Sequence, residues 1–284
     1  MLDPRGSVIS KRLEKVRHVI AVSSGKGGVG KSTLACATAL RLSENHKVLL
    51  ISIDPAHSLS GILQRDIGHG LCKITKNLYV EELSAEDLVE EYTKKALSVI
   101  KEMIPTLSSA LEEYAKQLKH SPTALETALL DRLVDYFDGN FEFIVIDSAP
   151  TGQMVRLFYT MRSIEKWFSF LEKVAQERQK LENFMGRKDN LLELIRDRKD
   201  RVEKLMKVLK EKAVIFAVMN EDKLSAQEAD SIQKHLQNFR VYKVINKCSS
   251  LKESTIGVPY VENPYGIENL KKLPVEDILR LFEK

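Results

Sequence analysis

Residues 25–33 read GKGGVGKST, which satisfies the pattern G-x-x-x-x-G-K-[ST] and ends with Lys31, Ser32 and Thr33. Glycines allow the backbone to curl so that successive N–H groups point at phosphate oxygens, and a following helix adds the positive end of its dipole. Lys31 can neutralise the outer phosphates of a nucleotide, and the Ser32 hydroxyl can bind Mg²⁺. The stretch therefore predicts a loop that binds ATP with magnesium. The expected ATP-binding residues of this loop are Gly25, Lys26, Gly27, Gly28, Val29, Gly30, Lys31, Ser32 and Thr33.

The same stretch also contains G-x-G-x-x-G, the pattern of a dinucleotide-binding loop. Asp54 lies near the distance expected for an acid that binds the ribose in such a fold. Lys31 and Ser32, however, have no role in a dinucleotide fold, whereas both are expected in a phosphate-binding loop. We therefore favour the phosphate-binding loop.

Short apolar runs surround the loop and recur along the chain. The run at 18–24 (HVIAVSS) ends at the glycines, and residues 31–42 after the loop have helical character. Further runs, each predicted to be a strand, lie at 47–53, 77–83, 141–146, 213–219, 241–245 and 257–261. Strands that alternate with helices imply βα units and a buried parallel sheet. The predicted fold is α/β, a P-loop NTPase with a parallel sheet flanked by helices.

Two helical stretches interrupt the alternation of strands and helices. In residues 85–137, apolar side chains recur at intervals of three and four, which is the period of an amphipathic helix, and Pro105 predicts a break. Residues 155–211 form a longer and strongly charged helical region. We expect both stretches to form an α-helical subdomain inserted into a single ATPase domain that spans 1–284.

Two of the predicted strands are followed by an aspartate. Asp54 opens the loop DPAHSLS at 54–60, where it can orient the water that attacks the γ-phosphate. Asp147 opens DSAPTGQ at 147–153, in the position of an acid that holds magnesium directly or through water. Because the carboxyl ends of parallel strands share one edge of the sheet, both loops are expected beside the phosphate loop.

Both loops are expected to act as switches that move with the state of the γ-phosphate. The residues expected to serve this movement are Pro55, His57, Pro150 and Gly152. The first loop also allows a plainer interpretation, in which Asp54 and Pro55 form an ordinary turn and His57 is a structural hydrogen-bonding side chain.

Composition narrows the functional classes. The chain has 284 residues, with 44 basic and 40 acidic side chains and a net charge of +4, which predicts no broad nucleic-acid surface. Cys36, Cys72 and Cys248 are far apart and form no CxxC pair, so neither a disulfide framework nor a zinc site is expected. No apolar signal segment or membrane-spanning run is visible, and we expect a cytoplasmic location.

The stretches GKGGVGKST with its extra Lys26, DPAHSLS, and DSAPTGQMVRL at 147–157 together resemble the arsenite-pump and tail-anchored-protein-targeting ATPase family. The resemblance implies a homodimer that opens and closes with nucleotide. It implies that Asp54, Lys26 and Lys31 are catalytic, with Lys26 reaching a phosphate across the dimer. On sequence pattern alone, Lys26 could equally be a solvated side chain. The family also implies that Asn246 and the loop near Pro259 contact adenine.

The leading functional hypothesis is that nucleotide-driven dimer opening controls a hydrophobic surface on the helical insert. Its partner would be a membrane-protein segment, as in membrane-protein targeting. Met161, Met185 and Met206 suit an adaptable surface, although for any single Met we favour the plainer interpretation that it packs in the core of the subdomain. One alternative is the ATP-hydrolysing subunit of an arsenite or anion efflux pump, with a membrane pump subunit as partner. Another is a partition or positioning ATPase.

Overall fold

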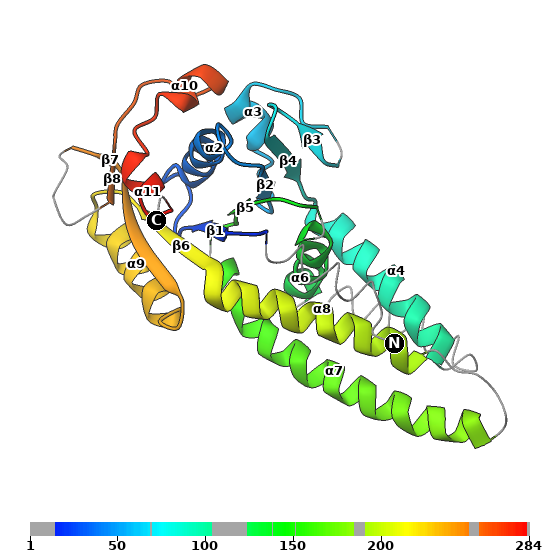
Figure 1. Ribbon diagram of the computed structural model, residues 1–284. Helices are drawn as coiled ribbons and strands as arrows, with labels where there is room; N and C mark the ends of the chain where they lie inside the picture. Colours follow the sequence, from blue (N-terminus) through cyan, green and yellow to red (C-terminus); the bar gives the residue numbers. More distant parts are fainter. Residues whose placement is uncertain are drawn as a thin grey trace. The chain divides into compact units, whose positions relative to one another are not determined.

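The computed structural model describes residues 15–68, 70–103, 124–137, 139–150, 152–184, 191–249 and 256–282. The chain divides into two compact units (Figure 1). The first comprises Met1–Ser84, Phe137–Val155 and Val208–Lys284, and the second comprises Ala85–Tyr136 and Arg156–Lys207. Pro105 and Met185 lie outside the described residues. That the two helical stretches form a subdomain inserted into a single ATPase domain stays a prediction.

The first unit is built on one eight-stranded sheet among the described residues, in the order β3-β4-β2-β5-β1-β6-β7-β8. Its strands are β1 (His18–Ser23), β2 (Val48–Ser52), β3 (Cys72–Lys73), β4 (Leu78–Glu82), β5 (Phe143–Asp147), β6 (Ala213–Met219), β7 (Arg240–Cys248) and β8 (Ile256–Pro259). Every neighbouring pair is parallel except β3 and β4. The predicted α/β fold is confirmed, with the correction that one edge strand is antiparallel. At two residues, β3 is too short to leave a pattern in the sequence.

The central strands are buried on both faces, as their continuous apolar runs predict. All residues of β2 and β5 are buried, and so are all residues of β1 after its first. In the register of these strands, Asp147 lies beside Val22 on one side and Ser52 on the other. The loops that follow β1, β2 and β5 therefore leave the sheet side by side at its carboxyl edge.

Helix α2 (Lys31–Leu42) starts at the glycine-rich loop and packs on the sheet. It contacts α3 (Leu59–Leu63) and α10 (Ile267–Lys271), and its buried apolar side chains belong to the core cluster of the unit. Two further helices of this unit are α9 (Lys223–His235), which packs against β6 and β7, and α11 (Glu276–Leu279), which contacts α2.

The described helices that form most of the second unit are α4 (Ala85–Met103), α6 (Ala124–Phe137), α7 (Gln153–Phe184) and α8 (Leu191–Lys212). Ala175 of α7 packs with Leu192 and Ile195 of α8. Glu172 joins the same two helices through ion pairs with Arg196 at 2.9 Å and Lys199 at 2.8 Å. Among the described residues, no helix combines the length and the apolar character needed to cross a bilayer.

Candidate active site

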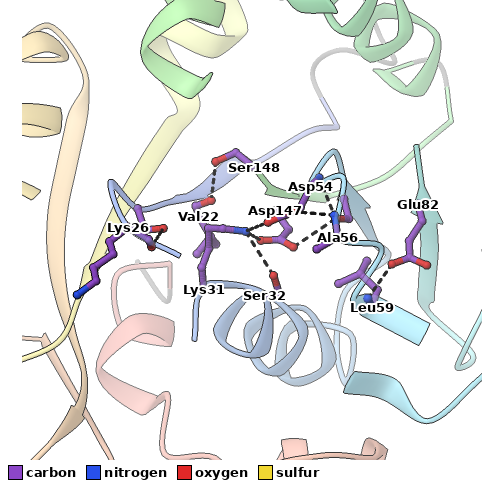
Figure 2. Close-up of polar contacts among 12 residues, drawn as sticks. Val22, Lys26, Lys31, Ser32, Asp54, Ala56, Leu59, Glu82, Asp147 and Ser148 are labelled. Carbon is purple, nitrogen blue, oxygen red and sulfur yellow. Dashed lines mark hydrogen bonds and ion pairs between the residues drawn. The ribbon is translucent and has the colours of Figure 1, made fainter. Parts of the chain in front are cut away.

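A cluster of polar side chains surrounds Lys31, the first residue of α2 (Figure 2). Its ammonium group lies 2.5 Å from Oδ1 of Asp147, 3.1 Å from Oδ2 of Asp54 and 3.3 Å from Oγ of Ser32. The side chain of Lys31 is only 6% exposed. The structure thus brings together a cation, a hydroxyl and two carboxylates from the three loops that the sequence singled out.

Burial dominates the electrostatics of Asp147, whose side chain is fully buried. Burial raises the pKa of its carboxyl, and the positive charge and hydrogen bond of Lys31 oppose that rise. Ser52 donates a hydrogen bond to the second oxygen of Asp147 at 3.3 Å. A buried charge is stable only when it is paired and hydrogen-bonded, and here both oxygens of Asp147 have a partner.

The glycine-rich loop adopts a backbone that depends on its glycines. Gly28 and Gly30 have φ angles of 79° and 84°, in the left-handed region. A Cβ on Gly25 would lie 2.5 Å from Cβ of Glu228, and a Cβ on Gly30 would collide with the amide nitrogen of Asn246. The buried Asn246 side chain donates to the carbonyl of Val29 at 2.7 Å and so supports the loop from β7.

The Asp54 loop combines the two interpretations drawn from its sequence. Oδ1 of Asp54 accepts a hydrogen bond from the backbone N–H of Ala56 at 3.0 Å, which is the turn expected of an Asp-Pro sequence. Its Oδ2 accepts the hydrogen bond from Lys31. Pro55 and His57 are exposed, and His57 has a φ angle of 44°. The same carboxylate therefore shapes the turn and belongs to the Lys31 cluster.

The Asp147 loop is tied to β1 and then reaches a glycine with a left-handed backbone. The backbone N–H and the hydroxyl of Ser148 both donate to the carbonyl of Val22, at 3.2 Å and 3.1 Å. Pro150 is half-buried, and Gly152 has a φ angle of 71°. The start of the loop is therefore fixed to the neighbouring strand, while Gly152 adopts a backbone that other residues rarely reach.

Three predicted site residues lie apart from the Lys31 cluster. Lys26 is exposed, and Figure 2 shows its side chain directed away from Lys31. The hydrogen bonds from Ser225 and the charge of Lys26 lower the pKa of Asp222, which places Lys26 near the start of α9. Asn246 lies under the loop, and Pro259 is the half-buried last residue of β8. Their predicted contacts with adenine stay predictions.

Sequence reasoning missed three polar residues that hold the site. Ser52 and Glu82 are the last residues of β2 and β4, and Glu228 packs its side chain against Gly25. A polar residue that ends an apolar strand is a signal for Ser52 and Glu82, because both then face the edge where the loops leave. Glu228 carries no such signal, since its place depends on how α9 packs against the loop.

These residues fit a nucleotide and its magnesium ion. A Cβ built on Gly27 or Gly28 would meet no atom within 4 Å, so open space lies beside the loop. The Ser32 hydroxyl and the two carboxylates are the oxygen ligands that Mg²⁺ prefers, and Lys31 supplies a positive charge for phosphate.

The sheet order, the glycine-rich loop that opens α2 and the aspartates at two strand ends define a P-loop NTPase. Residues 18–269 match the model of the family described as anion-transporting ATPase, and the chain belongs to that family. It is accordingly an ATPase. The resemblance noted from the sequence is confirmed.

Individual relatives support the same assignment. The chain is 31% identical over 225 residues to the Aquifex aeolicus protein named "Putative arsenical pump-driving ATPase 2", covering 76% of this chain and 75% of that protein. It is 31% identical over 157 residues to the arsenical pump-driving ATPase of Escherichia coli, covering 52% of this chain and 26% of that protein. It is 36% identical over 157 residues to the Cryptosporidium parvum protein named "ATPase ASNA1 homolog", covering 54% of this chain and 40% of that protein. The chain thus spans well under two thirds of the last two.

Proposed function

We propose that the Lys31 cluster is the catalytic centre of a magnesium-dependent ATP hydrolysis reaction. Lys31 and the backbone amides of the loop bind the phosphates, and Asp54 orients the attacking water. Ser32 and Asp147 would hold the magnesium ion, which when bound supplies positive charge to the phosphate oxygens. The observation that carries the proposal is the convergence of Lys31, Asp54 and Asp147 at 2.5–3.1 Å.

The proposed active unit is a homodimer that closes around nucleotide. Lys26 supports this, because it lies in the phosphate loop yet is exposed and directed away from Lys31 (Figure 2). A cation in that position is available to a phosphate bound by a second copy of the chain, in the manner of a finger residue supplied in trans.

The proposed role of hydrolysis is to control a hydrophobic client surface in the second unit, for membrane-protein targeting. Helix α7 exposes large apolar side chains: Tyr159 is 53% exposed, Phe170 56%, Val174 38% and Phe184 92%. Phe170 and Val174 are four residues apart and so share one helix face. Met206 is only 2% exposed and packs in the interior, so it does not contribute to this surface. The side chains of Met161 and Met185 lie outside the described residues.

Two variants test the catalytic centre. Lys31→Ala should abolish ATP-dependent turnover, because it removes the charge that holds the phosphates. Asp54→Asn should bind ATP but hydrolyse it slowly in a single turnover. Lys180→Ala, at a lysine that is 71% exposed, is the matched control. Wild-type rates in Lys31→Ala, or equal single-turnover rates in Asp54→Asn and wild type, would refute the assignment.

A second candidate function is the ATP-hydrolysing subunit of an arsenite or anion pump, which the names of two relatives favour. In this chain Cys36, Cys72 and Cys248 lie on three different elements, and Cys36 and Cys248 are buried. Stimulation of ATPase activity by arsenite or antimonite would support the pump. Stimulation by a hydrophobic helical peptide, together with recovery of an apolar segment on purified Asp54→Asn protein, would support targeting.

A further inference from the structure

The carboxylate of Glu82, at the end of β4, reaches across to the start of α3 (Figure 2). Its Oε1 accepts a hydrogen bond from the backbone N–H of Leu59 at 2.7 Å, and its Oε2 accepts one from the hydroxyl of Ser60 at 3.1 Å. Leu59 is fully buried, so its N–H has no access to water as a substitute partner. Both oxygens of Glu82 therefore hold the first turn of α3.

This anchor fixes the far end of the Asp54 loop. Residues 55–58 are all that separate Asp54 from Leu59, and 55–57 are exposed. At the near end, the N–H of Asp54 donates to Ser52 at 3.3 Å, and its carboxylate is held by Lys31. The loop is thus a short, exposed bridge between two anchors, one on β2 and one on β4. If Glu82 is lost, Leu59 keeps its buried apolar packing, but the first turn of α3 loses both hydrogen bonds that fix it to β4.

We propose that Glu82 is a positioning residue for ATP hydrolysis: it fixes the start of α3 and thereby holds the Asp54 carboxylate where it can orient the attacking water. The inference rests on the proposed role of Asp54. Among the residues that the structure describes, Glu82 hydrogen-bonds to Leu59 and Ser60 and not to Lys31 or the glycine-rich loop, so it acts through the Asp54 loop. Its loss should therefore affect the rate of hydrolysis and leave ATP binding unchanged.

A misplacement of about 1 Å at a reacting group can lower a rate by up to about 100-fold, so we expect Glu82→Ala to lower kcat by roughly 10- to 100-fold. The KM for ATP should stay close to wild type. Glu82→Gln keeps one oxygen for the N–H of Leu59 and should recover most of the rate. Glu142→Gln is the matched control, because Glu142 is also half-buried and accepts a backbone N–H, from Lys47 at 3.2 Å, but at the opposite edge of the sheet.

A readout without nucleotide tests the anchor directly. Amide hydrogen exchange of residues 54–63, measured by mass spectrometry on nucleotide-free protein, should be faster in Glu82→Ala than in wild type and close to wild type in Glu82→Gln. Unchanged exchange in this segment in Glu82→Ala would overturn the proposal. If Glu82→Ala does not fold, Ser60→Ala removes one of the two hydrogen bonds and should show a smaller increase of the same kind. Exchange in Ser60→Ala that matches wild type would then overturn it.

A double-mutant cycle separates this inference from the assignment of Asp54. If Glu82 acts through Asp54, Glu82→Ala should lower the rate of Asp54→Asn far less than that of wild type. Equal losses in both backgrounds would overturn the role of Glu82 and leave that of Asp54 standing. Wild-type turnover in Asp54→Asn would refute the proposed function itself, and the exchange measurement would still decide whether Glu82 holds the loop.

Discussion

Alanine substitutions in the glycine-rich loop should separate two costs that its glycines avoid. Gly28 has a left-handed backbone, but a Cβ there would meet nothing within 4 Å. Gly30 has a left-handed backbone, and its Cβ would also collide with the Asn246 amide. Gly25 has only the steric conflict, with Glu228, and Gly27 has neither. The loop therefore contains all four combinations of backbone strain and collision.

The structure sets the order of the expected losses in stability. A residue with a side chain in the left-handed region costs about 1–2 kcal/mol, which is the loss expected for Gly28→Ala. Gly30→Ala adds the displacement of the Asn246 amide from the buried Val29 carbonyl, about 1–3 kcal/mol more. Overpacking against Glu228 should cost Gly25→Ala about 1–3 kcal/mol. Gly27→Ala should change stability by less than about 1 kcal/mol in either direction.

Urea unfolding of the nucleotide-free variants measures these losses without interference from phosphate contacts. Gly30→Ala should be less stable than Gly28→Ala. In an Asn246→Ala background, Gly30→Ala should lower the free energy of unfolding only as much as Gly28→Ala does, because the colliding amide group is gone. Equal stability of Gly28→Ala and Gly30→Ala, or no recovery in the Asn246→Ala background, would refute the steric argument.

Two further predictions concern ionisable groups outside the active site. Burial, reinforced by the positive charge of Arg240, lowers the pKa of His18 below its ordinary 6.5. The imidazole therefore binds a proton more weakly in the folded chain than in the unfolded chain. The free energy of unfolding should therefore fall as the pH drops below about 6.5. Thermal unfolding at several pH values should show a weaker dependence of stability on pH in His18→Gln than in wild type. An unchanged dependence would contradict the argument. In the second unit, Glu126 is 3% exposed and pairs with Arg156 at 2.9 Å. Arg156→Ala leaves the buried carboxylate of Glu126 without this partner, and it should destabilise the protein by about 1–3 kcal/mol in urea unfolding at pH 7. Adding Glu126→Gln should recover part of that loss. A double variant no more stable than Arg156→Ala would count against this explanation.

The sequence predicts the parts of the site that depend on strand ends. Asp54 and Asp147 each follow an apolar run, and Lys31 ends the glycine-rich loop that follows another; parallel strands bring the loops after such runs to one edge. The sequence therefore predicts that the three loops lie side by side. For Glu82 the strand end predicts only the edge of the sheet, and not the contact with α3, because the neighbour of β4 is set by the order of strands, which the sequence pattern does not determine.

The sequence pattern also does not predict the contacts that support the glycine-rich loop. Asn246 and Glu228 are more than 190 residues away from the glycines that they contact. The packing of β7 and α9 alone brings them there. The amide nitrogen of Asn246 donates to Val29, and the predicted contact of Asn246 with adenine stays a prediction. A long-range contact of this kind has no periodicity or spacing by which it can be recognised.

The three contacts of Lys31 bear on how ATP would bind at the proposed site. An ammonium group has three N–H donors, and in Lys31 they face Asp147, Asp54 and Ser32. A phosphate oxygen can accept from Lys31 only by replacing one of these three partners. Because Asp54 and Asp147 open the two predicted switch loops, replacement of either carboxylate also removes a contact that holds its loop. Under the proposed function, the free energy of ATP binding would include the release of the contact that is replaced, which would couple occupation of the phosphate loop to the position of that aspartate's loop.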